Sequence, residues 1–600
     1  MRSEIARSTS GGFQARGIAG TRAILLAMDC SPQRLQGLRG FAIWRETKGR
    51  PTSGRWLRSF KVFKSVVPDP KPATGKNAPR YSTEDHPIQS FLWSDYTAAP
   101  DTTYLFRIIP KYGTPGSLSD DAADSLKVEV RTEAEEVVDG HGVWFNRGAI
   151  ASQAFSREFG DISPAEYVDD LDAPVTKWLS RGLAEACIAF IDGVPKGDEL
   201  VGCVYEFTYQ PVLIAIKAAI KRGVRVRLSY HETDVNSSAI ATAKLPRTSK
   251  GKQVLFPRTK PKIPHNKFFV HVRKAVPHAV WTGSTNITPS GFLGQSNVGH
   301  VVEDGHVAQA YYDYFEALSL DPTLAKARDA VVALSPHPPE LVASSPLPVV
   351  FSPRRTSNML DWYGNRIEDA AEGVMFTGAF GINARLLPRL TKNRSFLRFV
   401  MLEKRPSAAE SAQLRSDRDL VVAYGAELGK TSIYKDKKFQ KVRIKNFSLD
   451  KWFAREEHYR KQGNIFFIHT KILLIDPLSE DPLVCTGSAN YSKNSLESND
   501  ENMLLIRGVP RIADIFLTEF DRLFRHFYFR DVANEIEAKG GDATGAFLDE
   551  RDSGADVWTK SYFRKGAFKT RRREMFFATA KRKWTAASGR RKKFETSDEA

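Results

Sequence analysis

Two apolar stretches of the chain, HNKFFVHV at residues 265–272 and IFFIHTKILLID at residues 465–476, each contain a histidine and a lysine two positions apart. Runs of β-branched and aromatic residues predict buried strands. Because side chains two apart on a strand share a face, His265 should point the same way as Lys267, and His469 the same way as Lys471. Each stretch therefore predicts a strand that carries an imidazole and an ammonium group to one place.

A second short pattern follows each of these stretches at the same distance. Gly283-Ser284-Thr285-Asn286 begins sixteen residues after Lys267, and Gly487-Ser488-Ala489-Asn490 begins sixteen residues after Lys471, so the whole pattern recurs 204 positions apart. In each copy the serine and the asparagine are two apart and share a face by the same rule. The unchanged spacing predicts two halves of one active site.

This combination of side chains suits a phosphodiester. Lysine and asparagine can hold the non-bridging oxygens and stabilise charge in the transition state. Two imidazoles can divide the work, one as nucleophile and one as general acid. We therefore expect no metal and no other cofactor. The predicted catalytic residues are His265, Lys267, His469 and Lys471, and the predicted phosphate-binding residues are Ser284, Asn286, Ser488 and Asn490.

The paired pattern resembles the phospholipase D superfamily, the HKD phosphodiesterases, over roughly residues 140–540. The resemblance implies an α/β fold of two fused α/β/α lobes related by a pseudo-twofold axis, with the site between them. It also implies a covalent phosphohistidine intermediate. Family habit would make His265 the nucleophile and His469 the acid, but the sequence alone does not assign the two roles.

The first half departs from the family pattern at two places. The family has an aspartate five residues after the lysine, which is Asp476 in the second half and Val272 in the first. Asp476 is an odd number of positions from His469, so it should face away from the imidazole and be structural. The family often uses a glutamate to orient a histidine. Glu501 fits that role, and Gly299 is its expected counterpart, so the two histidines should have unequal partners.

The rest of the chain predicts further domains. Short apolar runs with turn residues between them predict an all-β sandwich near the N-terminus, and GFAIWRE and DTTYLFRIIPKYG resemble strands of a fibronectin type III module. Strand and helix patterns alternate in the two lobes, as in a largely parallel or mixed sheet. The expected units are a disordered N-terminus (1–20), the sandwich (21–132), lobe 1 (133–340), lobe 2 (341–540) and a C-terminal tail (541–600).

The net charge of +18 is concentrated in that tail. Between Lys560 and Lys593 there are fourteen lysines and arginines and one acid, Glu574, which leaves about +5 for the rest of the chain. Aromatic residues are interleaved with these bases, so the tail could bind nucleic acid or an anionic membrane surface. The alternative is a solvated tail, partly packed on the body through its aromatics.

Other features bear on location and assembly. The four cysteines show no disulfide or zinc spacing, which favours a reducing compartment. The ILLAM run at residues 24–28 is too short for a signal peptide core or a membrane span. We therefore expect a cytoplasmic protein without a transmembrane segment, with secretion by a route that cleaves no signal left open. One chain holds both halves, so a monomer should suffice for one site.

Two features near the predicted site have no assigned role. Glu206, at the end of a predicted strand, is interpreted as an exposed acid, with contact to substrate left open. Residues 237–264 form a predicted basic loop, either an entrance for an anionic substrate or a surface loop.

These observations predict a metal-independent phosphodiesterase. A phospholipid head group is the favoured target, since both lobes are fused in one chain and the body is nearly neutral. The alternative is a nuclease acting on DNA or RNA, which would gain from the basic tail. A third hypothesis, a binding module with a decayed site, draws on the missing aspartate and glutamate of the first half.

Overall fold

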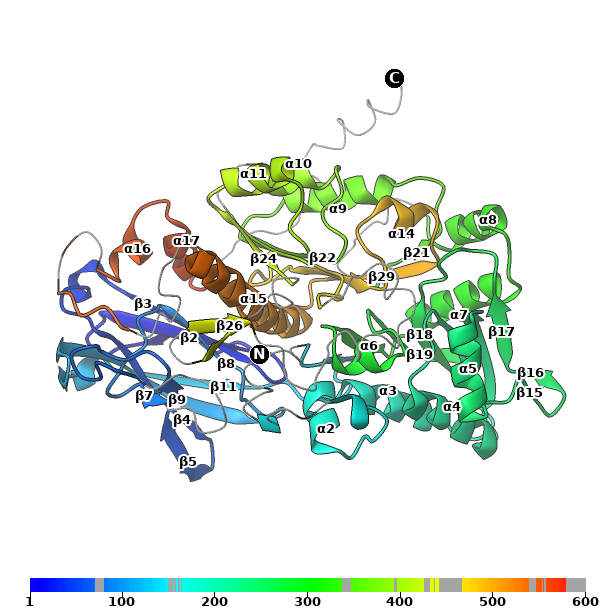
Figure 1. Ribbon diagram of the computed structural model, residues 1–600, viewed down its shortest axis with the longest axis horizontal. Coiled ribbons are helices and arrows are strands. Elements are labelled where there is room, and N and C mark those ends of the chain that lie inside the picture. The colour runs from blue at the N-terminus through cyan, green and yellow to red at the C-terminus, as the bar shows by residue number, and fades with distance from the viewer. Residues whose placement is uncertain are drawn as a thin grey trace, which may run out of the picture.

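The computed structural model is a mixed α/β protein with an all-β region at its N-terminus (Figure 1). Two seven-stranded sheets form the centres of two lobes, and the long helix α15 (Pro510–Ala538) lies between them and the sandwich. The structure describes residues 1–70, 80–148, 155, 158–159, 162, 164–336, 347–392, 396–425, 432–435, 438–441, 467–538, 547–552, 554 and 557–578.

The two large sheets repeat one topology. The first has the order β12-β20-β19-β18-β13-β14-β17 and the second the order β21-β29-β28-β27-β22-β23-β24. In both, the fifth strand is antiparallel to the fourth and parallel to the sixth, which is parallel to the seventh. The predicted pair of matching lobes is therefore confirmed.

The strands of the first sheet are β12 (His141–Phe145), β20 (Val298–Val302), β19 (Val276–Gly283), β18 (Lys267–Arg273), β13 (Glu199–Val204), β14 (Arg225–His231) and β17 (Leu255–Arg258). Those of the second are β21 (Val349–Ser352), β29 (Glu501–Arg507), β28 (Leu483–Gly487), β27 (Ile472–Ile475), β22 (Gly373–Gly378), β23 (Leu397–Leu402) and β24 (Leu420–Tyr424). Most of these strands are buried along their whole length, because helices cover the sheets.

Helices pack on each sheet and include several that the sequence did not predict. The segment predicted as a loop at 237–264 contains most of α5 and the edge strand β17, so that prediction is wrong. Lobe 1 has α2 (Pro174–Ser180), α3 (Leu183–Asp192), α4 (Gln210–Arg222), α5 (Asp234–Ala243), α6 (Pro289–Leu293), α7 (Gly305–Ser319) and α8 (Leu324–Leu334). Lobe 2 has α9 (Asn358–Glu368), α10 (Leu387–Thr391), α11 (Ala408–Ser416) and α14 (Lys493–Glu497).

The N-terminal region consists of two packed sheets, and it begins earlier than the sequence predicted. Residues 1–20 were expected to be disordered, but β2 (Phe13–Ala19) pairs with β3 (Ile24–Cys30), and Phe13 is buried in the sandwich core. The reason is the alternating burial of β2, which supplies part of the inner face. The resemblance to a fibronectin type III module stays a prediction. The other strands are β1 (Ala6–Arg7), β8 (Leu92–Asp95), β10 (Ser117–Ser119), β9 (Thr103–Thr114), β4 (Gly40–Thr47), β5 (Arg50–Trp56) and β11 (Leu126–Arg131).

Helix α15 is joined to lobe 1 by a buried ion pair. Its Glu519 accepts two hydrogen bonds from Arg181 of lobe 1, at 2.8 and 2.9 Å, and one from Arg522 at 2.8 Å. Burial would raise the pKa of Glu519, but the two guanidinium groups outweigh it and hold the pKa at about 2. Although α15 is long, no helix among the described residues is both long and apolar enough to cross a membrane.

The first part of the basic tail is folded onto the body. It forms α16 (Lys560–Phe563), whose Tyr562 and Phe563 rings pack against Phe91 of the sandwich, and α17 (Phe568–Glu574), whose Phe568 packs against Phe399 of lobe 2. Three consecutive arginines, Arg571–Arg573, each pair with an aspartate of a different unit; we call them the arginine clasp. The partners are Asp419 beside β24, Asp521 of α15 at 3.0 Å, and Asp29 of the sandwich.

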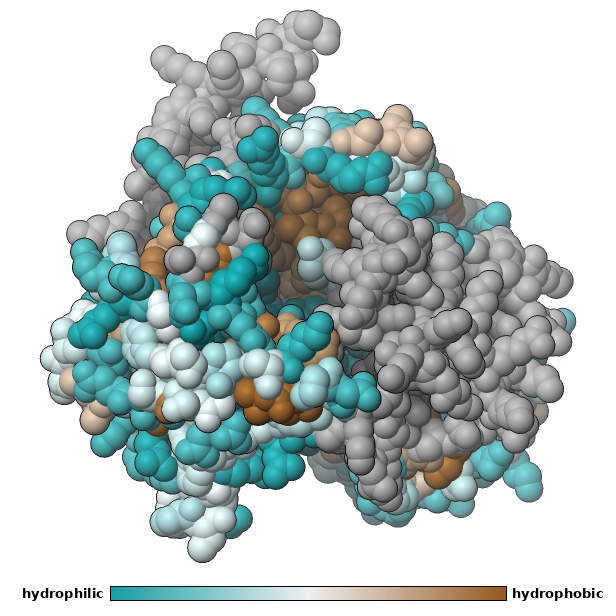
Figure 2. All heavy atoms as spheres, turned by 60° about the vertical axis from the view of Figure 1, so that its left-hand side comes forward, coloured by the Kyte–Doolittle hydropathy of each residue, from teal (hydrophilic) through white to brown (hydrophobic). Residues whose placement is uncertain are grey.

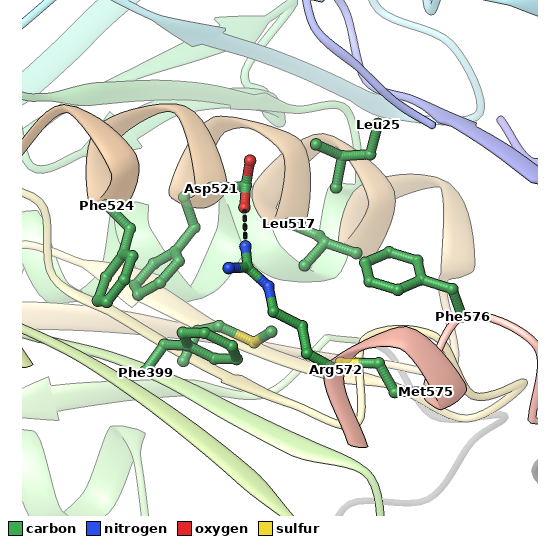
Figure 3. A pocket seen from close by; sticks show the side chains of 10 residues that line it. Leu25, Phe399, Leu517, Asp521, Phe524, Arg572, Met575 and Phe576 are labelled. Carbon is green, nitrogen blue, oxygen red and sulfur yellow. Dashed lines mark hydrogen bonds and ion pairs between the residues drawn. The ribbon is translucent and has the colours of Figure 1, made fainter. Parts of the chain in front are cut away.

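The clasp borders an apolar pocket. Figure 3 shows Arg572 reaching across it to Asp521, between α15, α17 and lobe 2. Figure 2 shows that this side of the molecule is largely hydrophilic around one hollow lined by hydrophobic atoms. Packing of the tail through its aromatics, one of the two interpretations, therefore holds up to residue 578, and residues 579–593 lie outside the described part of the chain. The pocket is lined by Leu25, Met375, Phe399, Leu517, Phe520, Asp521, Phe524, Arg572, Met575 and Phe576.

Candidate active site

The two histidine-lysine pairs come together where the lobes meet. The rings of His265 and His469 have their centroids 6.3 Å apart with their planes at 72°. Both histidines are buried, with 5% and 2% of their surface exposed. Neither is inside a strand as predicted, because β18 begins at Lys267 and β27 begins at Ile472. The histidines therefore lie just before the strands, at the ends that face the opposite lobe.

Each histidine is hydrogen-bonded by a residue of the other lobe. Glu501 Oε2 lies 2.8 Å from His265 Nδ1, and Asn297 Oδ1 lies 2.9 Å from His469 Nδ1. The partners are unequal, as expected, but the expected alignment was wrong. Asn297, eleven residues after Asn286, is the counterpart of Glu501, eleven residues after Asn490, and Gly299 is not.

The orientation of Asn297 fixes which nitrogen of His469 carries a proton. The Nδ2 group of Asn297 donates to the carbonyl of Gly291 at 2.9 Å, so its Oδ1 faces the imidazole. The same Oδ1 accepts a hydrogen bond from Ser284 Oγ at 2.8 Å. His469 must therefore donate from Nδ1, which leaves Nε2 directed at the site.

The two serines of the pattern contact the histidine partners. Ser284 bonds Asn297, and Ser488 hydrogen-bonds the side chain of Glu501. Each serine hydroxyl also accepts a backbone N–H one residue beyond its partner, from Val298 at 3.1 Å and from Asn502 at 3.0 Å. In this structure the hydroxyls are thus engaged with the strand that carries the histidine partner, whereas the sequence predicted that they face the phosphate.

The two asparagines of the pattern keep free acceptors. Asn286 Nδ2 donates to Glu206 Oε2 at 2.6 Å. The Oδ1 atoms of Asn286 and Asn490 are buried and have no hydrogen-bond partner among the described residues. Glu206, interpreted from sequence as an exposed acid, is instead half-buried within the site. The burial of Glu206 could not be predicted from the residues next to it in the sequence, because it depends on the lobe that faces it.

Asp476 has the structural role that its odd spacing predicts. Its carboxylate accepts backbone N–H groups of Ala371, Glu372 and Gly373 at 2.7–3.0 Å, where β22 begins. In lobe 1 the carboxylate comes from the facing strand. Asp198, just before β13, accepts the backbone N–H of Lys274 at 3.1 Å and contacts His271 at 2.8 Å. The absence of an aspartate at Val272 is therefore compensated locally.

A hydrogen-bond network that the sequence did not reveal joins the lobes beside the site. Asn502 of lobe 2 donates to Asn266 Oδ1 at 2.9 Å. Its own Oδ1 accepts from Thr282 and from Tyr311, both at 2.8 Å. Next to it, buried Arg258 of lobe 1 donates to Asp500 at 2.9 Å. These contacts fix the strand that carries Glu501 against lobe 1.

Burial dominates the electrostatics of the site. It lowers the pKa of Lys267 to about 7, against the opposing influence of Glu501 and Glu206, and holds the pKa of Lys471 well below its usual value. It raises the pKa of Glu501 and of Glu206 to about 7 each, although Lys267 acts to lower both. The pKa of His265 lies well below its usual value because of burial and both lysines. A bound anion would restore charge to the lysines, so the site is suited to one.

The described residues contain no group of three or more histidine, cysteine, aspartate or glutamate side chains placed to hold a metal ion. All four cysteines are free and buried.

Comparisons with known proteins bear on the family. A family model described as cardiolipin synthase, PLD-like domain, matches residues 196–319 and 426–524. No curated protein matches the chain. Among solved structures it is similar to polyphosphate kinase from Porphyromonas gingivalis, with 9% identity, a TM-score of 0.34 and coverage of 56% of this chain and 46% of that one. The chain thus spans less than half of that kinase.

Two further structures resemble it at low identity. Phosphatidylserine synthase from Haemophilus influenzae Rd KW20 is 11% identical, with a TM-score of 0.37 and coverage of 62% of this chain and 94% of that one. Nuc from Salmonella typhimurium, a phospholipase D family member, is 23% identical, with a TM-score of 0.19 and coverage of 22% and 84%. The family model matches once in each lobe, and each match contains one copy of the paired pattern. Residues 196–319 and 426–524 thus match a PLD-like domain, one segment in each lobe.

Proposed function

We propose that the protein is a metal-independent phosphodiesterase that cleaves a phospholipid head group through a phosphohistidine intermediate. The PLD-like domain supports an enzyme acting on phosphodiesters. The observation that carries the proposal is the pair of buried imidazoles, 6.3 Å apart between centroids, with a lysine beside each. Asn286 Nδ2 donates one proton to Glu206 and has a second to offer a phosphate oxygen, and Asn490 is the matching residue of lobe 2.

His265 is the nucleophile in this proposal because its partner carries a charge. Glu501 accepts the Nδ1 proton of His265, which leaves the Nε2 lone pair to attack phosphorus. Attack forms a P–N bond and makes the imidazole cationic, and the carboxylate stabilises that charge. The P–O bond to the leaving alcohol breaks in the same step, while Lys267 and Lys471 stabilise the phosphoryl oxygens.

His469 is the general acid because its partner is neutral. Asn297 orients the ring without holding the imidazolium as strongly as a carboxylate would, so the proton passes readily to the leaving oxygen. The negative charge of the bound diester raises the pKa of His469 and favours its protonation. In the second step His469 accepts a proton from water, which attacks phosphorus and breaks the P–N bond. Ser284 and Ser488 act by positioning Asn297 and Glu501.

The folded tail favours a lipid over a nucleic acid. The arginine clasp is neutralised by three aspartates of the body, which leaves less free positive charge in the described part of the tail for a polyanion. A nuclease remains the second candidate because of exposed lysines on the approach to the site. Lys260 and Lys262 lie five and three residues before His265, and Lys250 and Lys252 lie on the hairpin of β15 (Thr248–Ser249) and β16 (Lys252–Gln253).

The substrate class can be tested with purified protein in EDTA. Phosphatidylcholine, single- and double-stranded DNA, and RNA are supplied in parallel. Choline release without nicking supports the lipid proposal, nicking without choline release supports the nuclease, and neither activity supports a decayed binding module.

The mechanism can be tested with bis(p-nitrophenyl) phosphate, whose leaving group needs no acid. We expect H469N to release one equivalent of p-nitrophenol and to accumulate phosphorylated protein, because the second step lacks its base. H265N should give neither product. Equal labelling of the two variants would refute the assignment of roles.

A further inference from the structure

The two lobes differ at one position beside the phosphate site. Glu206 is the second residue after β13 in lobe 1, and Phe380 is the second residue after β22, the matching strand of lobe 2. In lobe 1 the chain runs on to a bridge between Phe207 and Ile287, whereas in lobe 2 it turns back between Gly378 and Gly381, so Glu206 and Phe380 follow different local paths. Glu206 is half-buried, whereas the side chain of Phe380 is 59% exposed. Glu206 is therefore an acid of lobe 1 that has no matching acid in lobe 2.

The contacts of Glu206 show that it belongs to the site. Asn286 donates to its Oε2 at 2.6 Å. Both Lys267 and Lys471 lie close enough to favour its ionised form, in opposition to its burial. The side chains of both lysines and both histidines are buried, so Glu206 is one of the few groups of the site that retain contact with the outside.

The charges in the site show why this carboxyl needs a partner from the substrate. Two lysines face two carboxyl groups, Glu501 and Glu206, and Glu501 is engaged with His265. A phosphodiester adds one negative charge. A carboxylate beside a bound phosphate is unfavourable, and Asn286 donates only to Oε2 of Glu206, which leaves Oε1 to meet a hydrogen-bond donor or a cation of the substrate.

We propose that Glu206 is a specificity-determining residue that binds a hydroxyl or ammonium group on the alcohol part of the substrate, a few bonds from the phosphate. The inference rests on the proposed phosphodiester chemistry and goes beyond it. The substrate is bound with its polar alcohol toward Glu206. Head groups such as ethanolamine and glycerol carry the required donor.

Equilibrium binding tests this without turnover. Calorimetry compares three phosphate monoesters of similar size: O-phosphoethanolamine with an ammonium group, glycerol 3-phosphate with hydroxyls, and propyl phosphate with neither. We expect the wild-type protein to bind at least one of the first two about fivefold or more tightly than propyl phosphate. E206L should lose that preference, and E206Q, which keeps an acceptor oxygen, should keep part of a hydroxyl preference and lose an ammonium preference.

The matched control is E303Q, an exposed carboxylate just after β20, at the end of the sheet remote from Asn297. It should leave all three affinities unchanged. Equal affinity of the wild-type protein for the three esters, or a preference that survives in E206L, overturns the role of Glu206 and leaves the proposed chemistry standing. Failure of the wild-type protein to bind any of the esters overturns both.

Discussion

Replacing Glu501 by glutamine should disable His265 while preserving the shape of the site. In the wild-type protein Oε1 of Glu501 accepts from Asn499 Nδ2 at 3.2 Å, and Oε2 faces His265 Nδ1 at 2.8 Å. The side-chain amide of E501Q has one acceptor (C=O) and one donor (NH₂) for the contacts with Asn499 and His265. If its NH₂ faces Asn499, two donors meet; if it faces His265, the ring must accept at Nδ1 and carry its proton on Nε2, which removes the attacking lone pair.

The magnitude follows from what is lost. A charge-assisted hydrogen bond contributes about 2–3 kcal/mol, and a buried donor left without an acceptor costs about 1 kcal/mol more. Together these are about 3–4 kcal/mol in the barrier to attack, which corresponds to a decrease of about 10²–10³-fold in rate. The Asn297 side of the site is unchanged, so binding of the diester should be affected much less than its attack.

The assay is the pre-steady-state release of p-nitrophenol from bis(p-nitrophenyl) phosphate, which reports attack by His265. The matched variant is N297D, which gives His469 a carboxylate instead of an amide. Because this leaving group needs no acid, N297D should change the burst rate by less than about tenfold. A burst in E501Q within about fivefold of the wild-type rate, or a larger loss in N297D than in E501Q, would refute the assignment of His265 as nucleophile.

Other parts of the structure give expectations about stability. Asp476→Ala leaves three backbone N–H groups without their acceptor, so urea titration should show a loss of about 2–4 kcal/mol in unfolding free energy; an unchanged midpoint would contradict the structural role. Burial of His141, and to a smaller extent the positive charge of Arg511, lowers the pKa of His141 from 6.5 to about 4. The unfolded chain therefore binds a proton that the folded chain does not, and the unfolding free energy should fall by up to about 3 kcal/mol as the pH drops from 6.5 to 4. H141Q should flatten that slope. The triple variant R571Q/R572Q/R573Q should release α16 and α17, so that trypsin cleaves near residue 565 faster than in the wild type; equal rates would show that the aromatic contacts suffice.

The sequence predicted the centre of the molecule because the relevant signals are local. A histidine, a lysine, a serine and an asparagine at fixed spacing indicate the family, and β-branched runs indicate the strands beside them. The odd spacing of Asp476 was enough to predict that it faces away from His469.

The partner of His469 and the burial of Glu206 could not be predicted from the sequence, because both depend on contacts between distant segments. Ser296-Asn297 and Ser498-Asn499 have the same sequence. Aligning these two pairs shifts the alignment of the lobes by two residues, so that Gly299 instead of Asn297 is matched with Glu501. The true register is set by hydrogen bonds from the Gly-Ser segments to the neighbouring strand. Glu206 was taken for an exposed acid because nothing nearby in the sequence shows that the other lobe faces it.

Because each histidine is hydrogen-bonded by a residue of the other lobe, neither lobe contains a complete site. Each half supplies an imidazole that only the other half can orient, so a fragment carrying one copy of the pattern would have a ring with no fixed tautomer. This arrangement also means that one pair of matched positions, Asn297 and Glu501, gives the two histidines different partners. Exchanging those two side chains should therefore exchange the roles of the two histidines.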